Sequence, residues 1–429
     1  MVSSRIVELA SIITTKTKQI DDYLTSHDLP PLSFEPKEES QQHAIPHSIQ
    51  VAQNAVLEAT DELNALMLGP MGILTQQLLS SNQLIGLHAI HRFNIAEKFP
   101  KDKNEVSYSE LSHETGLQES QLRRVFRQAM TQRIFTQPTK DTVAHTAASK
   151  MLTKPHVRER VGWTCDEKWP ASAKAVPALA KWPGSQEPTH TGFNLENRTE
   201  DPMFEELAKF PPRAEQFAGS MSFRATSKGD HVSHLLEGYP WAELGACTVV
   251  DMGGSRGPTS IALATKFPNL KCIVQDLPGT VAGCSPPIEL EGRLQYMAHN
   301  FFTEQPVKGA DIYFFRRIFH DWSDEYAARI LRCLIGALKP GAKVLIQDLV
   351  VPAYGDVSLY EQKKHCHTDL NMLTMLNARE RSAEEWDSLI QGADPGLKLS
   401  RIIQPPLASQ GIIEIVLRDV TSLDQGPRL

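Results

Sequence analysis

The sequence predicts an α/β protein, with a doubly wound, mostly parallel sheet in its C-terminal part and a mostly α-helical N-terminal part. Three observations lead to this prediction. From Tyr239 onward, strand-like and helix-like runs alternate, which is the pattern of parallel strands joined by crossover helices. The first of these strands leads into a glycine-rich turn followed by a helix-like run. Before residue 239, apolar residues recur mostly at helical spacing.

The C-terminal part contains seven strand-like runs, the last two of which read as a hairpin-like pair. They are residues 247–252, 270–276, 294–298, 311–315, 343–348, 397–403 and 412–417. Ligands of such sheets bind at the carboxyl ends of the strands. We therefore expect a ligand where residues 253–257 and Asp276 converge.

The first strand continues into an Asp-x-Gly-Gly-x-x-Gly sequence formed by Asp251, Gly253, Gly254 and Gly257. Glycine suits a tight turn with unusual backbone angles and lets a ligand approach the main chain. The sequence lacks the Gly-Lys-Ser/Thr of a phosphate loop. Asp276 ends the second strand, where an acid binds the ribose hydroxyls of nucleotide-type ligands.

The N-terminal part is predicted to begin with a helix over residues 6–24 and a polar linker over residues 35–47. Two further helices are predicted over residues 49–67 and 78–96. The helix over residues 6–24 packs either on the body of the protein or on a second subunit, and the sequence does not decide between these alternatives.

Residues 108–111, Gly116 and residues 119–130 have the spacing of a helix–turn–helix. A short extended piece over residues 134–137 follows, as in a winged helix. The second helix carries Arg123, so it is either a DNA recognition helix or a solvated or partner-facing helix. A net charge of −7 and the lack of another basic surface favour the second interpretation.

Composition places the chain among ordinary globular proteins, with 41% hydrophobic and 22% charged residues over 429 positions. That length predicts two domains. No apolar run approaches the roughly 20 residues that span a bilayer, and no secretory signal is visible. The six cysteines are scattered singly without a Cys-x-x-Cys, which favours a reducing compartment, and we expect the cytoplasm.

A second motif, Arg316-Arg317-Ile318-Phe319-His320-Asp321-Trp322, follows the fourth predicted strand. Together with the glycine turn it resembles the class I S-adenosylmethionine-dependent O-methyltransferases of the fungal and plant small-molecule type, such as sterigmatocystin and caffeate O-methyltransferases. The resemblance is best over residues 239–416 and weaker over residues 48–223.

The resemblance implies a Rossmann-like seven-stranded methyltransferase sheet with S-adenosylmethionine as its cofactor. It also implies an N-terminal winged-helix-like dimerisation domain, and hence a homodimer. We expect four segments: residues 1–47 as a helix and linker, 48–155 as the winged-helix-like domain, 156–238 as connecting helices and a substrate-pocket segment, and 239–429 as the cofactor-binding catalytic domain. Within the third segment, residues 163–197 are either a cover or part of an aromatic substrate pocket.

The reaction needs a base, because a phenol with a pKa of about 10 is mostly protonated at neutral pH. A neutral histidine can accept that proton, and His320 is the candidate general base. An acid on the other ring nitrogen fixes the tautomer and stabilises the cation. The family uses two such acids, and the matching residues are Asp348, where glutamate is commoner, and Glu380.

The resemblance also assigns binding residues. Asn300 stands where the family has an aspartate, although its amide oxygen can still accept from an adenine amino group. The residues assigned to the cofactor are Asp251, Gly253, Gly254, Ser255, Gly257, Asp276, Leu277, Asn300, Phe301 and Arg316. Those assigned to the substrate are Asp321, Met372, Asn377 and Met203. Asp321 has a second interpretation as a cap of the helix that starts near Ser323.

These residues predict an enzyme that O-methylates a phenolic or enolic hydroxyl of a small polyketide, alkaloid or other aromatic metabolite. The alternative is a methyltransferase fold that binds S-adenosylmethionine but catalyses a pericyclic or dehydration step. A DNA-binding or regulatory protein is a third hypothesis, although we expect neither a nucleic-acid nor a membrane partner. His365 and Asp369 stand one helical turn apart, but no second ligand pair accompanies them, so we expect no metal.

Overall fold

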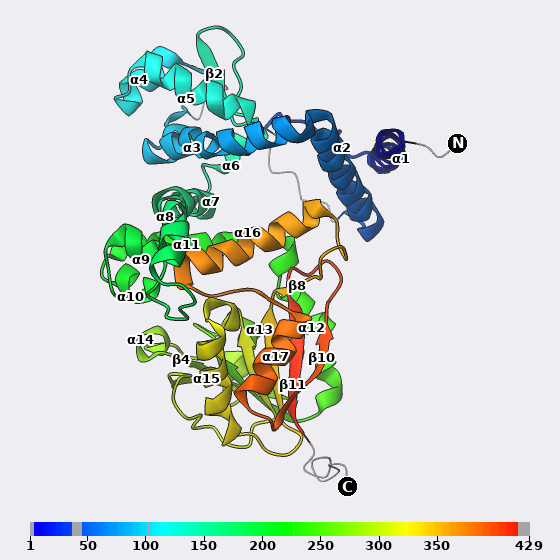
Figure 1. The fold of residues 1–429 in the computed structure, drawn as a ribbon, viewed down its shortest axis with the longest axis vertical. Coiled ribbons are helices and arrows are strands. Elements are labelled where there is room, and N and C mark those ends of the chain that lie inside the picture. Colours follow the sequence, from blue (N-terminus) through cyan, green and yellow to red (C-terminus); the bar gives the residue numbers. More distant parts are fainter. Residues whose placement is uncertain (1–3, 37–44, 101–102, 104, 226, 419–429) are drawn as a thin grey trace. The chain divides into compact units, whose positions relative to one another are not determined.

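The computed structural model describes residues 4–36, 45–100, 103, 105–225 and 227–418 (Figure 1). The chain forms two compact units that interleave in sequence. The first unit comprises Met1–Trp169, Phe210–Phe223 and Val357–Lys364, and the second comprises Pro170–Lys209, Arg224–Asp356 and His365–Leu429. The four consecutive segments expected from the sequence stay a prediction.

The first unit begins with two helices that pack on each other, α1 (Arg5–Ser26) and α2 (His47–Leu79). The expected end of the second helix at residue 67 is wrong, because α2 continues through a kink. Gly69 has a φ of 63° and Pro70 follows it, so the chain bends there and resumes the helix. The next expected helix is also broken: the chain passes through a 3₁₀ turn, Ser80–Asn82, into α3 (Gln83–Arg92).

A helix–turn–helix follows in the first unit. A capping box between Ser107 and Glu110 starts α4 (Tyr108–Thr115), and Gly116 ends it with a φ of 73°. The second helix is α5 (Glu119–Thr131). Two short strands, β1 (Glu105–Ser107) and β2 (Thr142–Ala144), pair antiparallel beside them. The expected helix–turn–helix is confirmed, whereas a winged-helix role in dimerisation stays a prediction.

Arg123 on α5 is held within this unit. Its guanidinium lies 4.1 Å from the centre of the Tyr108 ring and donates to Asp141 Oδ1 at 2.9 Å and to the Lys140 carbonyl at 2.9 Å. An arginine tied to its own unit in this way is poorly placed to neutralise a phosphate. This contact therefore supports the partner-facing or solvated interpretation of the helix.

Further helices continue the chain as far as the start of the large sheet. They are α6 (Ala147–Met151), α7 (Pro155–Gly162), a π-helical turn (Trp163–Lys168), α8 (Trp169–Lys181), α9 (Gly192–Asn197), α10 (Met203–Ala208), α11 (Pro211–Ala225) and α12 (Ser233–Gly238). No described helix has the length and apolar character required to cross a bilayer.

The second unit contains a seven-stranded sheet in the order β10-β11-β7-β6-β3-β4-β5. Strands β3 to β7 of this sheet are parallel, and β11 and β10 close it as an antiparallel pair. The strands are β3 (Cys247–Met252), β4 (Leu270–Asp276), β5 (Leu294–Ala298), β6 (Ile312–Arg316), β7 (Lys343–Asp348), β10 (Leu397–Ile403) and β11 (Gly411–Leu417). The expected α/β class and all seven expected strands are confirmed, with shifts of one residue in β6 and β11.

Both faces of the sheet are covered, which explains the apolar character of its strands. On β6, Tyr313 and Phe315 join a core on one face, while Ile312 and Phe314 join a core on the other. Helices α15 (Asp324–Ile335) and α17 (Ala383–Ala393) pack on the first face (Figure 1). Helices α12 and α13 (Pro258–Lys266) pack on the second.

The strand order reverses at β3, which lies between β4 and β6. In such sheets a crevice forms beyond the carboxyl ends of the strands at the reversal point. The segments that follow β3, β4, β5, β6 and β7 carry most of the expected site residues, so the topology brings them to one edge.

Candidate active site

The backbone angles of the turn after β3 and its contacts with neighbouring residues require its glycines. Gly253 and Gly257 have φ values of 71° and 77°, in the region that glycine adopts readily. A Cβ on Gly254 would lie 2.7 Å from Asp251 Cγ and 2.9 Å from Val274 Cγ1. The amides of Gly253 and Gly254 donate to the Gln275 carbonyl at 2.8 and 3.1 Å. The turn is therefore pressed against the end of β4.

Two acids brace this turn in different ways. Asp251 is buried, and its Oδ2 accepts from Ser260 Oγ of α13 at 2.6 Å. Burial raises the pKa of Asp251 to about 6, although the Ser260 hydrogen bond opposes the rise. Asp276 accepts from the amide of Ser255 at 2.9 Å and from that of Leu277 at 2.8 Å. The acid expected to bind ribose thus lies directly beside the glycine turn.

The segment after β5 contains the residues expected to hold adenine. Asn300 Oδ1 accepts from the Phe302 amide at 3.0 Å, so the side chain closes its own turn. The Phe301 ring stands edge-on to Trp322, with 6.1 Å between ring centres. A Cβ on Gly253 would lie 3.6 Å from Phe301 Cε1, which places this ring next to the glycine turn.

Arg316 ends β6 and is fixed by two contacts. Its Nη1 donates to Thr259 Oγ1 at 3.1 Å and its Nη2 to the Asp230 carbonyl at 2.7 Å. Burial lowers the pKa of Arg316 to about 10, and the neighbouring Arg317 adds to this effect. Arg317 in turn pairs with Asp230 Oδ1 at 2.6 Å. The two arginines therefore anchor the start of the His320 segment.

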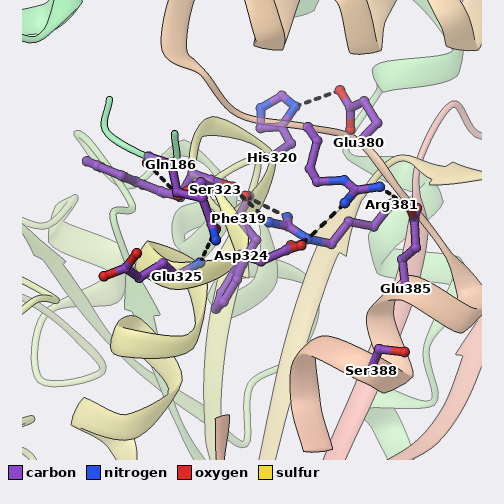
Figure 2. Close-up of polar contacts among 12 residues, drawn as sticks. Gln186, Phe319, His320, Ser323, Asp324, Glu325, Glu380, Arg381, Glu385 and Ser388 are labelled. Carbon is purple, nitrogen blue, oxygen red and sulfur yellow. Dashed lines mark hydrogen bonds and ion pairs between the residues drawn. The ribbon is translucent and has the colours of Figure 1, made fainter. Parts of the chain in front are cut away.

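His320 lies in a single 3₁₀ turn, Phe319–Asp321, and is only 6% exposed. Its Nδ1 is 3.0 Å from Glu380 Oε1, and its Nε2 is 3.5 Å from Asp321 Oδ1 (Figure 2 shows the Glu380 contact). Burial alone would lower the pKa of His320. The carboxylates of Asp321, Glu380 and Asp348 outweigh burial and raise this pKa to about 9.

The two acids expected to flank the base make different contacts. Glu380 reaches the ring, and its amide donates to Asp369 Oδ1 at 2.9 Å. Asp348 is completely buried, and its Oδ2 accepts from the amides of Phe319 at 3.1 Å and His320 at 3.3 Å. Burial, together with Glu380 and Asp321, raises the pKa of Asp348 to about 7 against the opposing effect of His320. Among the described contacts, the Asp348 carboxylate thus bonds the main chain of the base rather than its ring.

Of the residues expected to bind substrate, Asn377 is tied to a remote loop. Its Nδ2 donates to the carbonyls of Ser185 at 2.9 Å and Glu187 at 3.0 Å. Met203 is buried at the start of α10, whereas Met372 is half-buried on α16 (Leu359–Leu376). The four substrate assignments stay predictions.

The alternative role of Asp321 as a helix cap is wrong. Helix α15 begins at Asp324 with Ser323 as its N-cap residue. The first turn of α15 instead receives a contact from far along the chain, since the Glu325 amide donates to Gln186 Oε1 at 2.8 Å. Ser323 Oγ also donates to the Gln186 carbonyl at 2.8 Å (Figure 2).

Arg381 is the residue of this site that sequence reasoning passed over. Its side chain is buried, and it donates through Nη1 to the Phe319 carbonyl at 2.9 Å and through Nη2 to the Trp322 carbonyl at 2.8 Å. Its Nε donates to Asp324 Oδ1 at 2.8 Å (Figure 2). A basic residue directly after the candidate acid Glu380 was the available signal. Within the described parts of the chain, no group of three His, Cys, Asp or Glu side chains is arranged to hold a metal ion.

Comparison with known proteins identifies the family. The chain is 38% identical to a grayanic acid biosynthesis cluster O-methyltransferase of Cladonia grayi, over 96% of this chain and 88% of that protein. It is 34% identical to a chlorophenol O-methyltransferase of Trichoderma longibrachiatum, over 96% of this chain and 90% of that protein. Residues 203–394 match the family model of the O-methyltransferase domain. The chain belongs to the O-methyltransferase family.

Solved structures share the fold of this O-methyltransferase. The crystal structure of OxaC matches with a TM-score of 0.76 and 22% identity over 96% of this chain and 99% of OxaC. A structure described as a pericyclic reaction enzyme matches with a TM-score of 0.72 and 22% identity over 95% of this chain and all of that one. At this level of identity the likeness concerns the fold alone.

S-adenosylmethionine is the methyl donor of this O-methyltransferase, and the residues at the carboxyl edge of the sheet suit it. In the turn after β3, Gly253 and Gly257 have φ values of 71° and 77°, and glycines in such a turn let a ligand approach the main chain. Asp276 stands beside that turn with a half-buried carboxylate, as a ribose-binding acid requires. The individual cofactor contacts stay predictions.

Proposed function

We propose that this O-methyltransferase methylates a phenolic or enolic hydroxyl of a small secondary metabolite in a fungal biosynthetic pathway, with His320 as the general base. The observation that carries the proposal is the 3.0 Å contact between His320 Nδ1 and Glu380 Oε1 at the carboxyl edge of the sheet. The names of the fungal relatives support a phenolic acceptor, since one of them acts on chlorophenol.

The arrangement accounts for proton removal from the acceptor. The Glu380 carboxylate accepts a hydrogen bond from Nδ1–H of His320, so the neutral ring carries its proton on Nδ1 and Nε2 is the basic nitrogen. The hydroxyl proton passes to Nε2, and the surrounding carboxylates stabilise the imidazolium that forms. The pKa of His320 is raised to about 9, which is close to the phenol pKa of about 10. The free energies of the proton on the phenol and on His320 are therefore similar. When bound, S-adenosylmethionine supplies a methyl group that is already activated.

A His320→Ala variant tests the proposal. We expect it to bind S-adenosylmethionine with unchanged affinity and to lose turnover by on the order of 100-fold or more, because the acceptor keeps its proton. Calorimetry would measure binding, and mass spectrometry would follow a product one CH₂ heavier than the phenolic substrate. Full turnover in this variant would remove His320 as the base.

The same assay addresses pericyclic or dehydrative chemistry. An isomer of the substrate, or a product that lacks one water, formed with no consumption of S-adenosylmethionine would replace methyl transfer as the function. The contact between His320 and Glu380 favours methyl transfer, because pericyclic chemistry needs no base oriented in this way.

We further propose that the enzyme is a homodimer joined through α2. This helix carries large apolar side chains that are exposed in the single chain, and so many exposed apolar side chains on one element favour an interaction site. They are Leu57, Leu66, Met67, Met71, Ile73, Leu74, Leu78 and Leu79.

A further inference from the structure

The turn that carries His320 has little support of its own. Phe319–Asp321 is a single 3₁₀ turn, and such turns have poorer hydrogen-bond geometry than an α-helix. Its main chain is instead bonded from two sides by buried charged side chains. Asp348 accepts two of its amides, and Arg381 donates to the carbonyls of Phe319 and Trp322 (Figure 2 shows the Arg381 contacts).

We propose that Asp348 and Arg381 are positioning residues that clamp the main chain of the His320 turn, while Glu380 orients the imidazole ring through Nδ1. The proposal rests on the proposed role of His320 as the base. In this proposal three charged residues have separate roles. Asp348 holds the main chain of the turn, whereas the sequence suggested that it orients the ring.

The Asp348 side of the clamp comes from the rigid centre of the sheet. Strand β7 lies between β6 and β11, and Asp348 is its last residue. Its Oδ2 receives both amides, whereas Oδ1 has no hydrogen-bond partner among the described residues. A carboxylate that accepts main-chain amides makes strong, charge-assisted bonds. One such oxygen therefore fixes two successive residues of the turn.

The Arg381 side of the clamp exploits the shape of a guanidinium. The planar group has five donors in a fixed fork, and three of its nitrogens bond the Phe319 carbonyl, the Trp322 carbonyl and Asp324. Asp324 begins α15, so Arg381 ties the turn to the helix that follows it. A lysine ammonium is a point charge and cannot meet three acceptors that are arranged around a planar fork.

The charge of Asp348 makes it possible to distinguish a residue that holds the main chain of the turn from one that orients the imidazole ring. The Asp348 charge helps to raise the pKa of His320. Asp348→Asn removes that charge but keeps an oxygen that can accept the two amides. The base would then lose its proton at lower pH while its position stays the same. Loss of a ring-orienting acid would instead reduce the rate at every pH.

The first experiment compares Asp348→Asn with Glu380→Gln. We expect Asp348→Asn to move the acid limb of the kcat/KM profile to lower pH and to lower the kcat plateau by much less than Glu380→Gln does. We expect Glu380→Gln to lower the plateau by on the order of 100-fold. If Asp348→Asn lowers the plateau as much as Glu380→Gln, Asp348 orients the ring and the clamp is wrong.

The second experiment compares Arg381→Lys with Arg379→Lys. Both arginines pair with Asp324, but Arg379 is 42% exposed and its described bonds go to Asp324 and Glu385 rather than to the turn. We expect Arg381→Lys to reduce kcat at least tenfold with little change in the KM for S-adenosylmethionine. Arg379→Lys should behave as wild type, and equal effects of the two variants would contradict the clamp.

A measurement without turnover separates failure of the clamp from failure of the proposed function. Hydrogen exchange of the peptide that spans the turn should become faster in Arg381→Lys than in Arg379→Lys, while exchange in β3 and β4 stays unchanged. Faster exchange throughout the sheet in Arg381→Lys would mean general destabilisation and would also overturn the clamp. If the turn alone exchanges faster but wild type methylates no phenol, the clamp holds and the proposed reaction fails.

Discussion

His320 is surrounded by more negative charge than a resting base requires. Asp321 and Glu380 approach its two ring nitrogens, and Asp348 bonds its amide. In so little solvent, these carboxylates favour the imidazolium. The charge that forms during proton transfer is therefore stabilised before the substrate arrives, which is the preorganisation that catalysis uses.

This charge predicts the pH dependence of the wild-type enzyme. The base acts in its neutral form, and its pKa is raised to about 9, so kcat/KM should increase with pH up to about 9. The profile would be measured with a simple phenol, alongside S-adenosylmethionine binding over the same range as a control. A plateau reached near pH 6.5, the usual histidine value, would contradict it.

The same shift affects stability. Because the pKa of His320 is higher in the folded protein than the usual 6.5, its charge stabilises the fold fully below about pH 6.5. That stabilisation is lost as the pH rises through about 9. His320 therefore becomes the active neutral base at the same high pH at which its charge stops stabilising the fold.

At the scale of elements, the sheet was predictable and the N-terminal helices were less so. Strands buried on both faces read as continuous apolar runs, and the β3 and β7 ends fall where the sequence places them. The kink at Gly69 was missed because a glycine–proline pair marks either a helix end or a bend. Tertiary packing decides between the two, and local sequence does not record it.

The candidate site, too, could be predicted from the sequence only in part. The resemblance places His320 beside Glu380, and the structure brings them to 3.0 Å. The Arg381 and Gln186 contacts join residues 62 and 139 positions apart, so spacing carries no sign of them. Asp348 differs from the commoner glutamate by one methylene, and its carboxylate reaches the main chain of the turn, which the sequence alone does not indicate.

The glycine turn gives a prediction at this scale. We expect Gly254→Ala to weaken S-adenosylmethionine binding by roughly tenfold or more, since overpacking costs about 1–3 kcal/mol. The added Cβ would lie 2.7 Å from Asp251 Cγ and push the turn out of place. Gly279→Ala is the matched control, because its Cβ would meet nothing within 4 Å. Calorimetry would compare them, and equal affinities would contradict the prediction.

For the whole molecule, the proposed dimer is tested by charge insertion on α2. Met71 and Leu78 are 75% and 80% exposed, so glutamate at both positions should leave the helix folded but prevent association. Sedimentation velocity should find a dimer for wild type and a monomer for Met71→Glu with Leu78→Glu. Ile288→Glu, at a 90% exposed position in the second unit, should remain dimeric. A monomeric wild type would exclude the dimer.

The contact between Gln186 and the first turn of α15 also has a consequence for biosynthesis. The parts that order His320 leave the ribosome at widely separated times: Gln186 early, Asp348 later, and Glu380 with Arg381 near the end. Contacts with such large sequence separation form slowly, and the N-terminal parts of a chain fold first during synthesis. The nascent chain therefore contains His320 before it contains Glu380 and Arg381, so the contacts that order the base form only when synthesis is nearly finished.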